Sequence, residues 1–305
     1  MTEERQTGVT AMVTAFARAY HATHDTPKIF DDYLAPQWFS DAERAFLEQN
    51  MSAMLATVDP QQAAACTDPA QALAWVMQHV NGPVTLCRSR YAEDCLEAAV
   101  RAGVGQYVLL GAGLDSFAFR SPAWAAGLQI FEVDHPATQA LKRQRLAGLG
   151  WPIPAGLHFI PLDFTRQSLE DGLKSGGYQE SRPAFFSWLG VTYYLDTGVV
   201  LDTLEALARL ASVGSQVVFD YQRPEAFDPQ HAGRQAQAMQ RVVARSGEPM
   251  KTGFDPQALA GQLARLGLRL EDNLGPAEIE ARYFQGRSDD YHAFPHIYLA
   301  RAGVA

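Results

Sequence analysis

The chain of 305 residues has few charged side chains and no cluster of positive charge. Asp, Glu, Lys and Arg make up 19% of the residues, and 34 acids against 25 Lys and Arg residues give a formal net charge of −9. No run of Lys or Arg offsets this acidic balance. A nucleic-acid surface normally needs a basic patch, so we expect no nucleic-acid partner.

Cysteine and long apolar runs are also scarce. The three cysteines, Cys66, Cys87 and Cys95, leave an odd number for disulfides and have no metal-like spacing. The histidines have no such spacing either, so we predict no metal site. No stretch reaches the ~18 apolar residues of a membrane span, and the first residues contain no apolar signal core. These absences predict reduced thiols, no membrane contact and a cytoplasmic location.

Apolar residues, at 47%, are abundant enough for a substantial core. In residues 1–85 they recur at roughly helical spacing between prolines, which predicts helices over 11–20 and 41–55. We interpret residues 1–85 as an N-terminal helical cap. Its aromatic and methionine side chains are expected to pack on a sheet or to cover a pocket.

From residue 86 to residue 305, short apolar runs alternate with amphipathic segments. Strands are predicted over 107–110, 129–133, 158–162, 184–188, 216–220, 269–274 and 296–300. Helices are predicted over 91–102, 136–149, 197–211 and 256–266. This alternation is typical of an α/β fold with a mostly parallel sheet and helices on both faces. A polar segment near 222–255 interrupts the pattern and is predicted to hold a helix over 232–246.

The most informative stretch is residues 106–120, where an apolar run leads directly into Gly111-Ala112-Gly113. The run predicts a buried strand, and glycine lets the backbone turn sharply because it has no Cβ. A ligand can therefore approach the chain closely at the carboxyl end of the strand, where open α/β sheets bind their ligands. This pattern is typical of a nucleotide-binding turn.

The next two predicted strands end in acids. Asp134 follows the second strand, where a carboxylate can accept hydrogen bonds from both hydroxyls of a ribose. Asp163 and Phe164 follow the third strand, where an acid can meet the amine of adenine while the ring packs on the base. Three successive strand ends thus predict a nucleoside site.

Two ligands fit a glycine turn followed by a ribose acid: a nicotinamide dinucleotide and S-adenosylmethionine. The dinucleotide fingerprint needs a third small residue where this chain has Ser116, and Asp115 would put negative charge beside two phosphates. S-adenosylmethionine has no phosphate, and Asp115 could lie near its ammonium group. The residues therefore favour S-adenosylmethionine, with an NAD(P)-dependent oxidoreductase as the alternative.

Three segments together resemble a known family. They are Gly-Ala-Gly-Leu-Asp-Ser-Phe-Ala-Phe-Arg at 111–120, Phe-Glu-Val-Asp-His-Pro at 131–136 with Lys142, and Leu-Gly-Val-Thr-Tyr-Tyr-Leu at 189–195. These motifs resemble the leucine carboxyl methyltransferase family, and more closely its bacterial branch of S-adenosylmethionine-dependent O-methyltransferases, some of which act on polyketides. The resemblance covers roughly residues 10–221 and the last strand. It implies a class I methyltransferase (Rossmann-like) fold with a seven-stranded sheet, a late antiparallel strand and an N-terminal helical cap.

The resemblance also implies roles for individual residues. Arg90 matches the arginine that holds the methionine carboxylate of the cofactor, and we rank Arg88 below it. Leu189 stands where eukaryotic members carry a glutamate, which argues against a phosphatase C-terminus as the methyl acceptor. The predicted cofactor residues are Arg90, Gly111, Ala112, Gly113, Asp134, His135, Asp163, Phe164 and Leu189.

Structural roles remain open for three of these residues. Asp134 could help to start the helix at Pro136, although proline at the first helical position makes His135 the cap. Asp163 could cap a helix near residue 168. Arg90 could pair with an acid on its own helix.

The methyl acceptor is the least defined part of the prediction. Tyr193 and Tyr194 are expected beside the transferred methyl group, and Asp220 is either an acceptor contact or a loop hydrogen bond. Contacts from the cap are weaker candidates, namely Tyr20, Arg18 and Lys28.

No histidine–acid pair near the predicted strand ends is convincing as a general base. This favours an acceptor that needs little help from a base, either a carboxylate or an acidic phenol of a small, polyketide-like molecule. A non-catalytic cofactor-binding protein is a further alternative. The sequence leaves the oligomeric state open, with a homodimer as one alternative.

Overall fold

The computed structural model describes residues 3–164, 166–228, 230, 232 and 250–304. Their strands form one seven-stranded sheet in the order β3-β2-β1-β4-β5-β7-β6. The strands are β1 (Gln106–Leu110), β2 (Gln129–Asp134), β3 (Leu157–Pro161), β4 (Ala184–Trp188), β5 (Gln216–Gln222), β6 (Leu268–Leu274) and β7 (Ile297–Val304). The first five are parallel, and β7 runs antiparallel between β5 and β6. This is the predicted class I methyltransferase fold.

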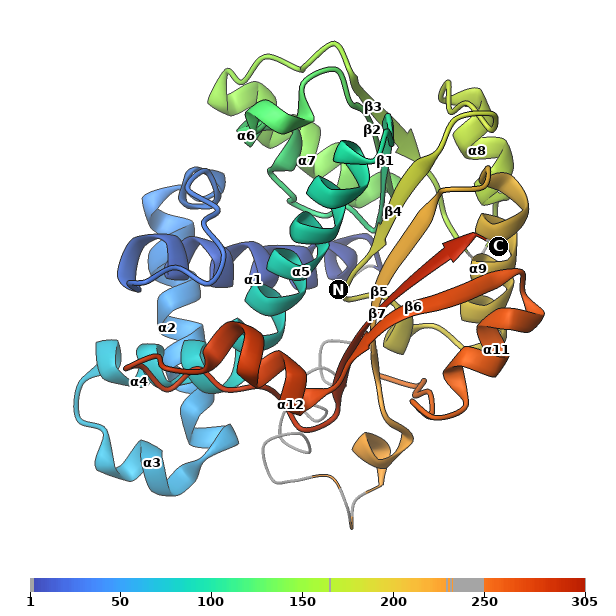
Figure 1. The fold of residues 1–305 in the computed structure, drawn as a ribbon. Coiled ribbons are helices and arrows are strands. Elements are labelled where there is room, and N and C mark those ends of the chain that lie inside the picture. The colour runs from blue at the N-terminus through green and yellow to red at the C-terminus, as the bar shows by residue number, and fades with distance from the viewer. Residues whose placement is uncertain (1–2, 165, 229, 231, 233–249, 305) are drawn as a thin grey trace.

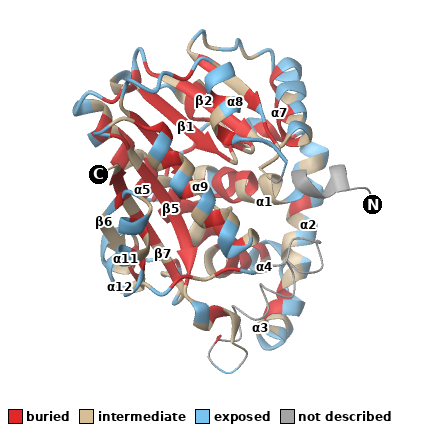
Figure 2. Cartoon of the chain, turned by 90° about the vertical axis from the view of Figure 1, so that its right-hand side faces the viewer, coloured by how far each residue is buried: buried red, intermediate tan, exposed pale blue. Residues whose placement is uncertain are grey.

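Alternation of side chains along the strands explains how the sheet is covered. Tyr107 and Leu109 of β1 pack on one face with α5 (Gly82–Arg101), whereas Val108 and Leu110 pack on the other with α8 (Leu169–Ser175). The second face also carries α9 (Thr197–Leu210) and α11 (Leu259–Arg265). Because both faces are covered, the central strands are buried over their whole length, as Figure 2 shows in red.

The other helices lie between strands or near the C-terminus. α6 (Phe117–Arg120) and η3 (Ala123–Ala125) follow β1, and α7 (Pro136–Leu149) joins β2 to β3 and ends at Gly150 in the left-handed conformation. η4 (Thr192–Tyr194) follows β4, η5 (Pro224–Phe227) follows β5, and α12 (Pro276–Ile279) with η6 (Glu280–Phe284) precedes β7. The predicted helix over 232–246 lies outside the described residues, apart from Ala232.

Residues 3–85 are mainly helical, as expected, and Figure 1 shows their blue helices on the side of the sheet away from α8, α9 and α11. They form α1 (Glu3–His24), η1 (Ala35–Trp38), α2 (Asp41–Val58), α3 (Pro60–Ala65), α4 (Pro69–Val76) and the π-helical turn η2 (Met77–Asn81). Local signals set the breaks: Ser40 and Glu43 form a capping box, and Asp59 and Asp68 cap helices whose first residue is proline.

The predicted boundary at residue 85 does not coincide with a break in the chain. Residue 85 lies inside α5, which runs on directly from α4 and η2. Gly82, at the start of α5, packs so closely on Tyr291 that an added Cβ would lie 2.5 Å from the ring. The cap and the sheet domain therefore share one helical segment.

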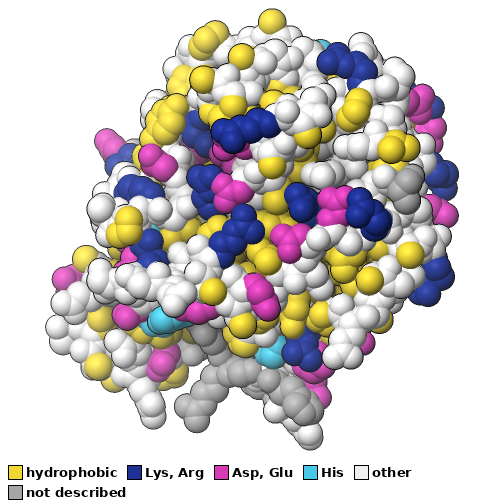
Figure 3. Space-filling model, viewed as in Figure 1, with side chains coloured by type: hydrophobic (Ala, Val, Ile, Leu, Met, Phe, Trp, Pro, Cys, Tyr) yellow, Lys and Arg dark blue, Asp and Glu magenta, His cyan; other side chains and the backbone are white. Residues whose placement is uncertain are grey.

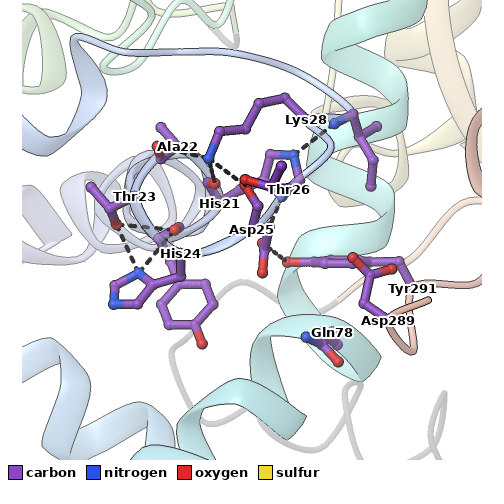
Figure 4. A network of polar contacts seen from close by, with 12 residues as sticks. His21, Ala22, Thr23, His24, Asp25, Thr26, Lys28, Gln78, Asp289 and Tyr291 are labelled. Atoms are coloured by element: carbon purple, nitrogen blue, oxygen red, sulfur yellow. Dashed lines mark hydrogen bonds and ion pairs between the residues drawn. The ribbon is translucent and has the colours of Figure 1, made fainter. Parts of the chain in front are cut away.

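A buried polar network ties the end of α1 to the C-terminal part of the chain (Figure 4). The backbone N–H of Ile29 donates to Nε2 of His21 at 2.8 Å, so Nδ1 of His21 carries the proton and donates to Asp25 at 2.7 Å. The Tyr291 hydroxyl donates to the same Asp25 carboxylate at 2.9 Å. Lys28 donates to backbone carbonyls at the end of α1, including that of His21 at 2.8 Å. This network fixes the cap against the segment before β7.

The surface carries charges of both signs, and the cysteines are free thiols. On the face seen in Figure 1, Lys and Arg side chains lie next to Asp and Glu side chains (Figure 3). Cys87 and Cys95 are buried, and all three cysteines are free thiols. Within the described part of the chain, no helix has the length and apolar character needed to cross a bilayer.

Candidate functional site

The glycine turn forms the floor of the site. The backbone N–H groups of Gly111 and Ala112 both donate to the carbonyl of Val133, at 2.8 and 3.2 Å, which ties the end of β1 to β2. Gly111 and Gly113 have φ values of +75° and +51°, which disfavour residues with a Cβ. An added Cβ on Gly111 would lie 2.7 Å from Val191. Glycine is therefore needed here for both conformation and space.

Asp134 holds the turn in place from the next strand. Its Oδ2 accepts from the N–H of Gly113 at 2.5 Å, and its Oδ1 accepts from the N–H of His135 at 2.6 Å. Burial raises the pKa of Asp134, and the two backbone hydrogen bonds oppose this shift. His135 is the N-cap of α7 and accepts from the N–H of Ala137 at 3.3 Å, so Asp134 is not the capping residue.

A cavity of about 320 Å³ opens over these strand ends. Gly113, Asp134 and Asp163 all line it, although they follow three different strands. Every predicted cofactor residue from Gly111 to Leu189 lines the same cavity. The structure thus brings together the three strand ends that the sequence singles out.

Arg90 is the exception. It lies on α5, where its Nε donates to Asp94 at 2.8 Å, and it lines a separate surface cavity with Tyr33 and Glu93. The side chain that reaches the main cavity is Arg88. Two residues along an α-helix are about 200° apart, so Arg88 and Arg90 point to nearly opposite sides. From the sequence we ranked Arg90 above Arg88. The structure reverses this order, because Arg88 lines the cavity and Arg90 does not.

Arg88 is buried and held by two partners. Its Nη1 donates to the Tyr193 hydroxyl at 2.9 Å and to Oδ2 of Asp220 at 3.1 Å. Burial opposes the charge, but Tyr193 and Asp220 outweigh it and raise the pKa of the guanidinium. Asp220 also accepts from the N–H of Gly190 at 2.6 Å. Of the two roles left open for Asp220, the structure therefore shows the loop hydrogen bond.

Gly190 lets the loop after β4 pass directly over this arginine. Its φ is +72°, and an added Cβ would lie 2.5 Å from Nη2 of Arg88. A side chain at this position would displace the guanidinium. The ends of β4 and β5 and the side chain of Arg88 thus form one rigid corner of the cavity.

A second cavity, of about 280 Å³, adjoins the first. Its lining is mainly apolar and comes from α1, α2, α5 and the segment that leads into β7, including Val13, Met51, Met54, Val84, Phe294 and Ile297. Six residues line both cavities: Thr10, Thr14, Thr85, Arg88, Gly190 and Tyr194. A ligand in one cavity can therefore meet a ligand in the other at this shared wall.

The acceptor candidates fall in different places. Tyr193 and Tyr194 both line the second cavity. Arg18 lines the first, where it donates to the carbonyl of Leu114 at 2.8 Å. Tyr20 stacks on His24 beside a third cavity, and Lys28 binds the carbonyls at the end of α1, so neither lines the first two cavities. Tyr20 and Lys28, which the sequence offered as weaker candidates for acceptor contacts, are therefore corrected.

Two further residues of the resembling motifs support the site from behind. Glu132 and Lys142 form an ion pair at 2.6 Å, and each side chain is 1% exposed. Burial raises the pKa of Glu132 to about 7, and Lys142 opposes this shift. The pair joins β2 to α7 beneath the cavity.

The comparison with known protein families decides the identity. The sequence matches the leucine carboxyl methyltransferase family over residues 11–208. The chain belongs to this family.

Relatives of this methyltransferase extend over the whole chain. "Putative S-adenosyl-L-methionine-dependent methyltransferase YktD" of Bacillus subtilis (strain 168) is 37% identical over 300 residues, which cover 98% of both proteins. A "Putative S-adenosyl-L-methionine-dependent methyltransferase" of Mycobacterium ulcerans (strain Agy99) is 28% identical over 95% of this chain and 89% of its own.

The fold has solved counterparts. A DUF574 family protein of Streptomyces avermitilis has a TM-score of 0.56 at 14% identity and covers 95% of this chain and 97% of its own. The structure of "a putative methyltransferase from Thermobifida fusca" has a TM-score of 0.53 at 15% identity and covers 83% of this chain and 94% of its own.

The methyltransferase is thus an enzyme whose cofactor is S-adenosylmethionine. The site explains why the dinucleotide alternative fails. After the glycine turn, Oδ1 of Asp115 accepts from the N–H of Phe117 at 2.7 Å, at the start of a helix of only four residues. No long helix begins here to face a pyrophosphate, in the part of the chain that the structure describes.

Sequence reasoning expected that the cap could cover a pocket, but it did not find which residues line the apolar cavity. Its lining combines the cap with the segment before β7, residues that are far apart along the chain. No spacing in the sequence joins them. The clustering of methionines in α2 is the one available signal, and it is equally typical of an ordinary core.

Proposed function

We propose that this methyltransferase transfers the methyl group of S-adenosylmethionine to an oxygen of a small apolar acceptor, which carries a carboxylate or an acidic phenol. One observation carries the proposal: a nucleoside-type cavity and an apolar cavity share a wall at Arg88, Gly190 and Tyr194. The transfer needs two ligands in contact, and this shared wall is where they would meet.

The residues of the first cavity, over the ends of β1, β2 and β3, fit the cofactor. Asp134 would accept from the ribose hydroxyls, while Asp163 and Phe164 would hold the adenine. The cavity is also lined by Asp115 and Glu93, so its acidic character suits a ligand with sulfonium and ammonium charges better than a diphosphate.

Arg88 is the proposed partner of the methionine carboxylate. It is the arginine at the shared wall, and its planar guanidinium can bind a carboxylate through two parallel hydrogen bonds. Asp220 and Tyr193 hold it in place before any ligand arrives. This removes part of the ordering cost of binding.

The chemistry asks little else of the chain. When bound, the cofactor supplies a methyl group already activated by the positively charged sulfur. The protein must align the acceptor oxygen with that methyl group and exclude water. An apolar cavity beside the cofactor site does both.

The cofactor assignment is tested with Arg88→Lys and the matched control Arg90→Lys. Lysine keeps a charge for Asp220 but loses the planar fork, so we expect R88K to weaken S-adenosylhomocysteine binding by about 1–3 kcal/mol, or roughly 5- to 150-fold. R90K should bind as the wild type does. Calorimetry with 5′-methylthioadenosine, which lacks the amino-acid part, should show no difference between the two variants.

The acceptor class is tested by product analysis. Incubation with S-adenosylmethionine and small aromatic acids or phenols should give products in which mass spectrometry and NMR locate the new methyl group on oxygen. A methyl group on nitrogen or carbon would overturn the proposal. An equal loss of S-adenosylhomocysteine affinity in R88K and R90K would mean that the carboxylate site is misplaced.

A further inference from the structure

His296 lies at the second cavity because of the direction of β7. The strand is antiparallel to β5, so its first residues lie at the sheet edge where the parallel strands end. Gln222, the last residue of β5, pairs with Ile297, and the N–H of Arg223 donates to the carbonyl of His296 at 3.0 Å. The imidazole of His296 lines the apolar cavity together with Gln222.

The imidazole is suited to accept a proton. Its Nδ1 is buried and has no hydrogen-bond partner among the described residues, so Nε2 is the ring nitrogen left to meet a ligand in the cavity. Burial lowers the pKa of His296, the nearby Arg223 lowers it further, and Glu225 opposes the shift. The ring is therefore uncharged near neutral pH. Arg88 and Tyr193 line the same cavity, but the guanidinium has no free lone pair and burial raises the pKa of Tyr193 far above its usual value.

The same cavity offers poor conditions for an acceptor carboxylate. Arg88 is the one Lys or Arg among the described residues that line it, and Asp220 already pairs with this arginine. If Arg88 also binds the cofactor carboxylate, no second Lys or Arg among the described lining residues would be left to pair with a carboxylate on the acceptor. An unpaired buried carboxylate is costly, whereas a neutral hydroxyl is accommodated once it has a hydrogen-bond acceptor.

We propose that His296 is the general base of this enzyme and that the acceptor is a phenolic hydroxyl on an apolar molecule. The inference rests on the proposed methyl transfer. A lone pair of the acceptor oxygen forms the new O–CH3 bond as the S–CH3 bond breaks, and the bonding pair stays on sulfur. The phenolic proton passes to the imidazole, which is left as imidazolium and then loses its proton to water.

The dimensions of the sheet allow this contact. β5 alone separates β7 from β4, so the start of β7 lies roughly 9–10 Å from the loop after β4, where the two cavities meet. One aromatic ring and the imidazole can span this distance together. A base at the start of β7 can therefore reach an acceptor oxygen that lies where the two cavities meet.

The test compares 2-naphthol with 2-naphthoate, which share a ring system and differ in the group that is methylated. The wild type should methylate 2-naphthol faster. His296→Gln should lower kcat/KM for 2-naphthol roughly 100- to 10,000-fold at pH 7, while S-adenosylhomocysteine affinity stays unchanged. His292→Gln is the matched control, because His292 is exposed and pairs with Glu280 at 2.9 Å.

The pH profile separates a base from a residue that merely shapes the cavity. A phenol ionises by itself near its pKa of ~10, so the defect of H296Q should shrink as the pH rises toward 10. It should also be smaller for 4-nitrophenol, which is more acidic. A structural role would leave the defect the same at every pH and for both phenols.

The outcomes divide clearly. Faster methylation of 2-naphthoate, an H296Q defect that does not depend on pH, or S-adenosylhomocysteine binding without methylation of either probe would each overturn the role of His296. Failure to bind S-adenosylhomocysteine at all would instead overturn the proposed function. A 2-naphthol preference with a pH-dependent H296Q defect supports the inference.

Discussion

Replacing Asp220 tests the corner that joins the two cavities. This carboxylate is fully buried and accepts from Arg88 at 3.1 Å and from the N–H of Gly190 at 2.6 Å. Asp220→Asn keeps the size of the side chain but removes the charge. The single amide oxygen of asparagine can replace only one of the two carboxylate oxygens. Its NH2 group would then face the other donor, either Arg88 or the N–H of Gly190.

The expected loss of stability is large. Removing one partner of a buried ion pair costs about 3–5 kcal/mol, because the other charge stays buried and uncompensated. Asparagine retains one acceptor, so we expect the lower end, about 3 kcal/mol. With a urea m value of about 3 kcal/mol per molar, the midpoint of unfolding should fall by roughly 1 M.

Equilibrium unfolding in urea, followed by circular dichroism, measures this shift. Asp196→Asn is the matched control, because its side chain is 74% exposed and lies 3.5 Å from Lys251. Such a surface pair contributes little, so this variant should unfold at the wild-type midpoint. A D220N midpoint equal to that of D196N would refute our account of how Arg88 is held.

Two further predictions concern the turn and the cap. Gly113→Ala places a Cβ 3.2 Å from that of Ala11 at a φ of +51°, so we expect about 1–2 kcal/mol of destabilisation and weaker S-adenosylhomocysteine binding. Gly148→Ala, whose added Cβ would meet no atom within 4 Å, should show neither effect in the same unfolding and calorimetric assays. Glu43 bonds to Arg145 and Ser40, which lower its pKa to about 2 from 4.5. Since the folded pKa lies below the unfolded one, Glu43→Gln should destabilise the protein at pH 7 but progressively less as the pH falls from about 4.5 to 2. A destabilisation in urea titrations that is as large at pH 2.5 as at pH 7 would contradict this.

The meeting of three strand ends at one cavity could be predicted because local signals and one topological rule suffice for it. An apolar run followed by glycines defines the end of a strand, and Asp134 and Asp163 each follow such a run. Parallel strands present their carboxyl ends at one edge of the sheet, so these residues meet whatever the details of packing. The structure brings them into one cavity.

The choice between Arg88 and Arg90 was beyond the sequence. Both lie on α5, and only the packing of that helix on the sheet decides which of its sides faces the cavity. A motif match fixes the position of an arginine to within a residue or two. On a helix, that error turns the side chain to the opposite side.

The apolar cavity depended on tertiary structure throughout. The sequence by itself determined the strands, the glycine turn and the acids, since these follow from short-range patterns. Whether Met51, Phe294 and His296 share a cavity depends on how the cap docks on the sheet and on the antiparallel direction of β7. Such contacts between distant segments arise from burial of the whole apolar surface, which no local pattern encodes.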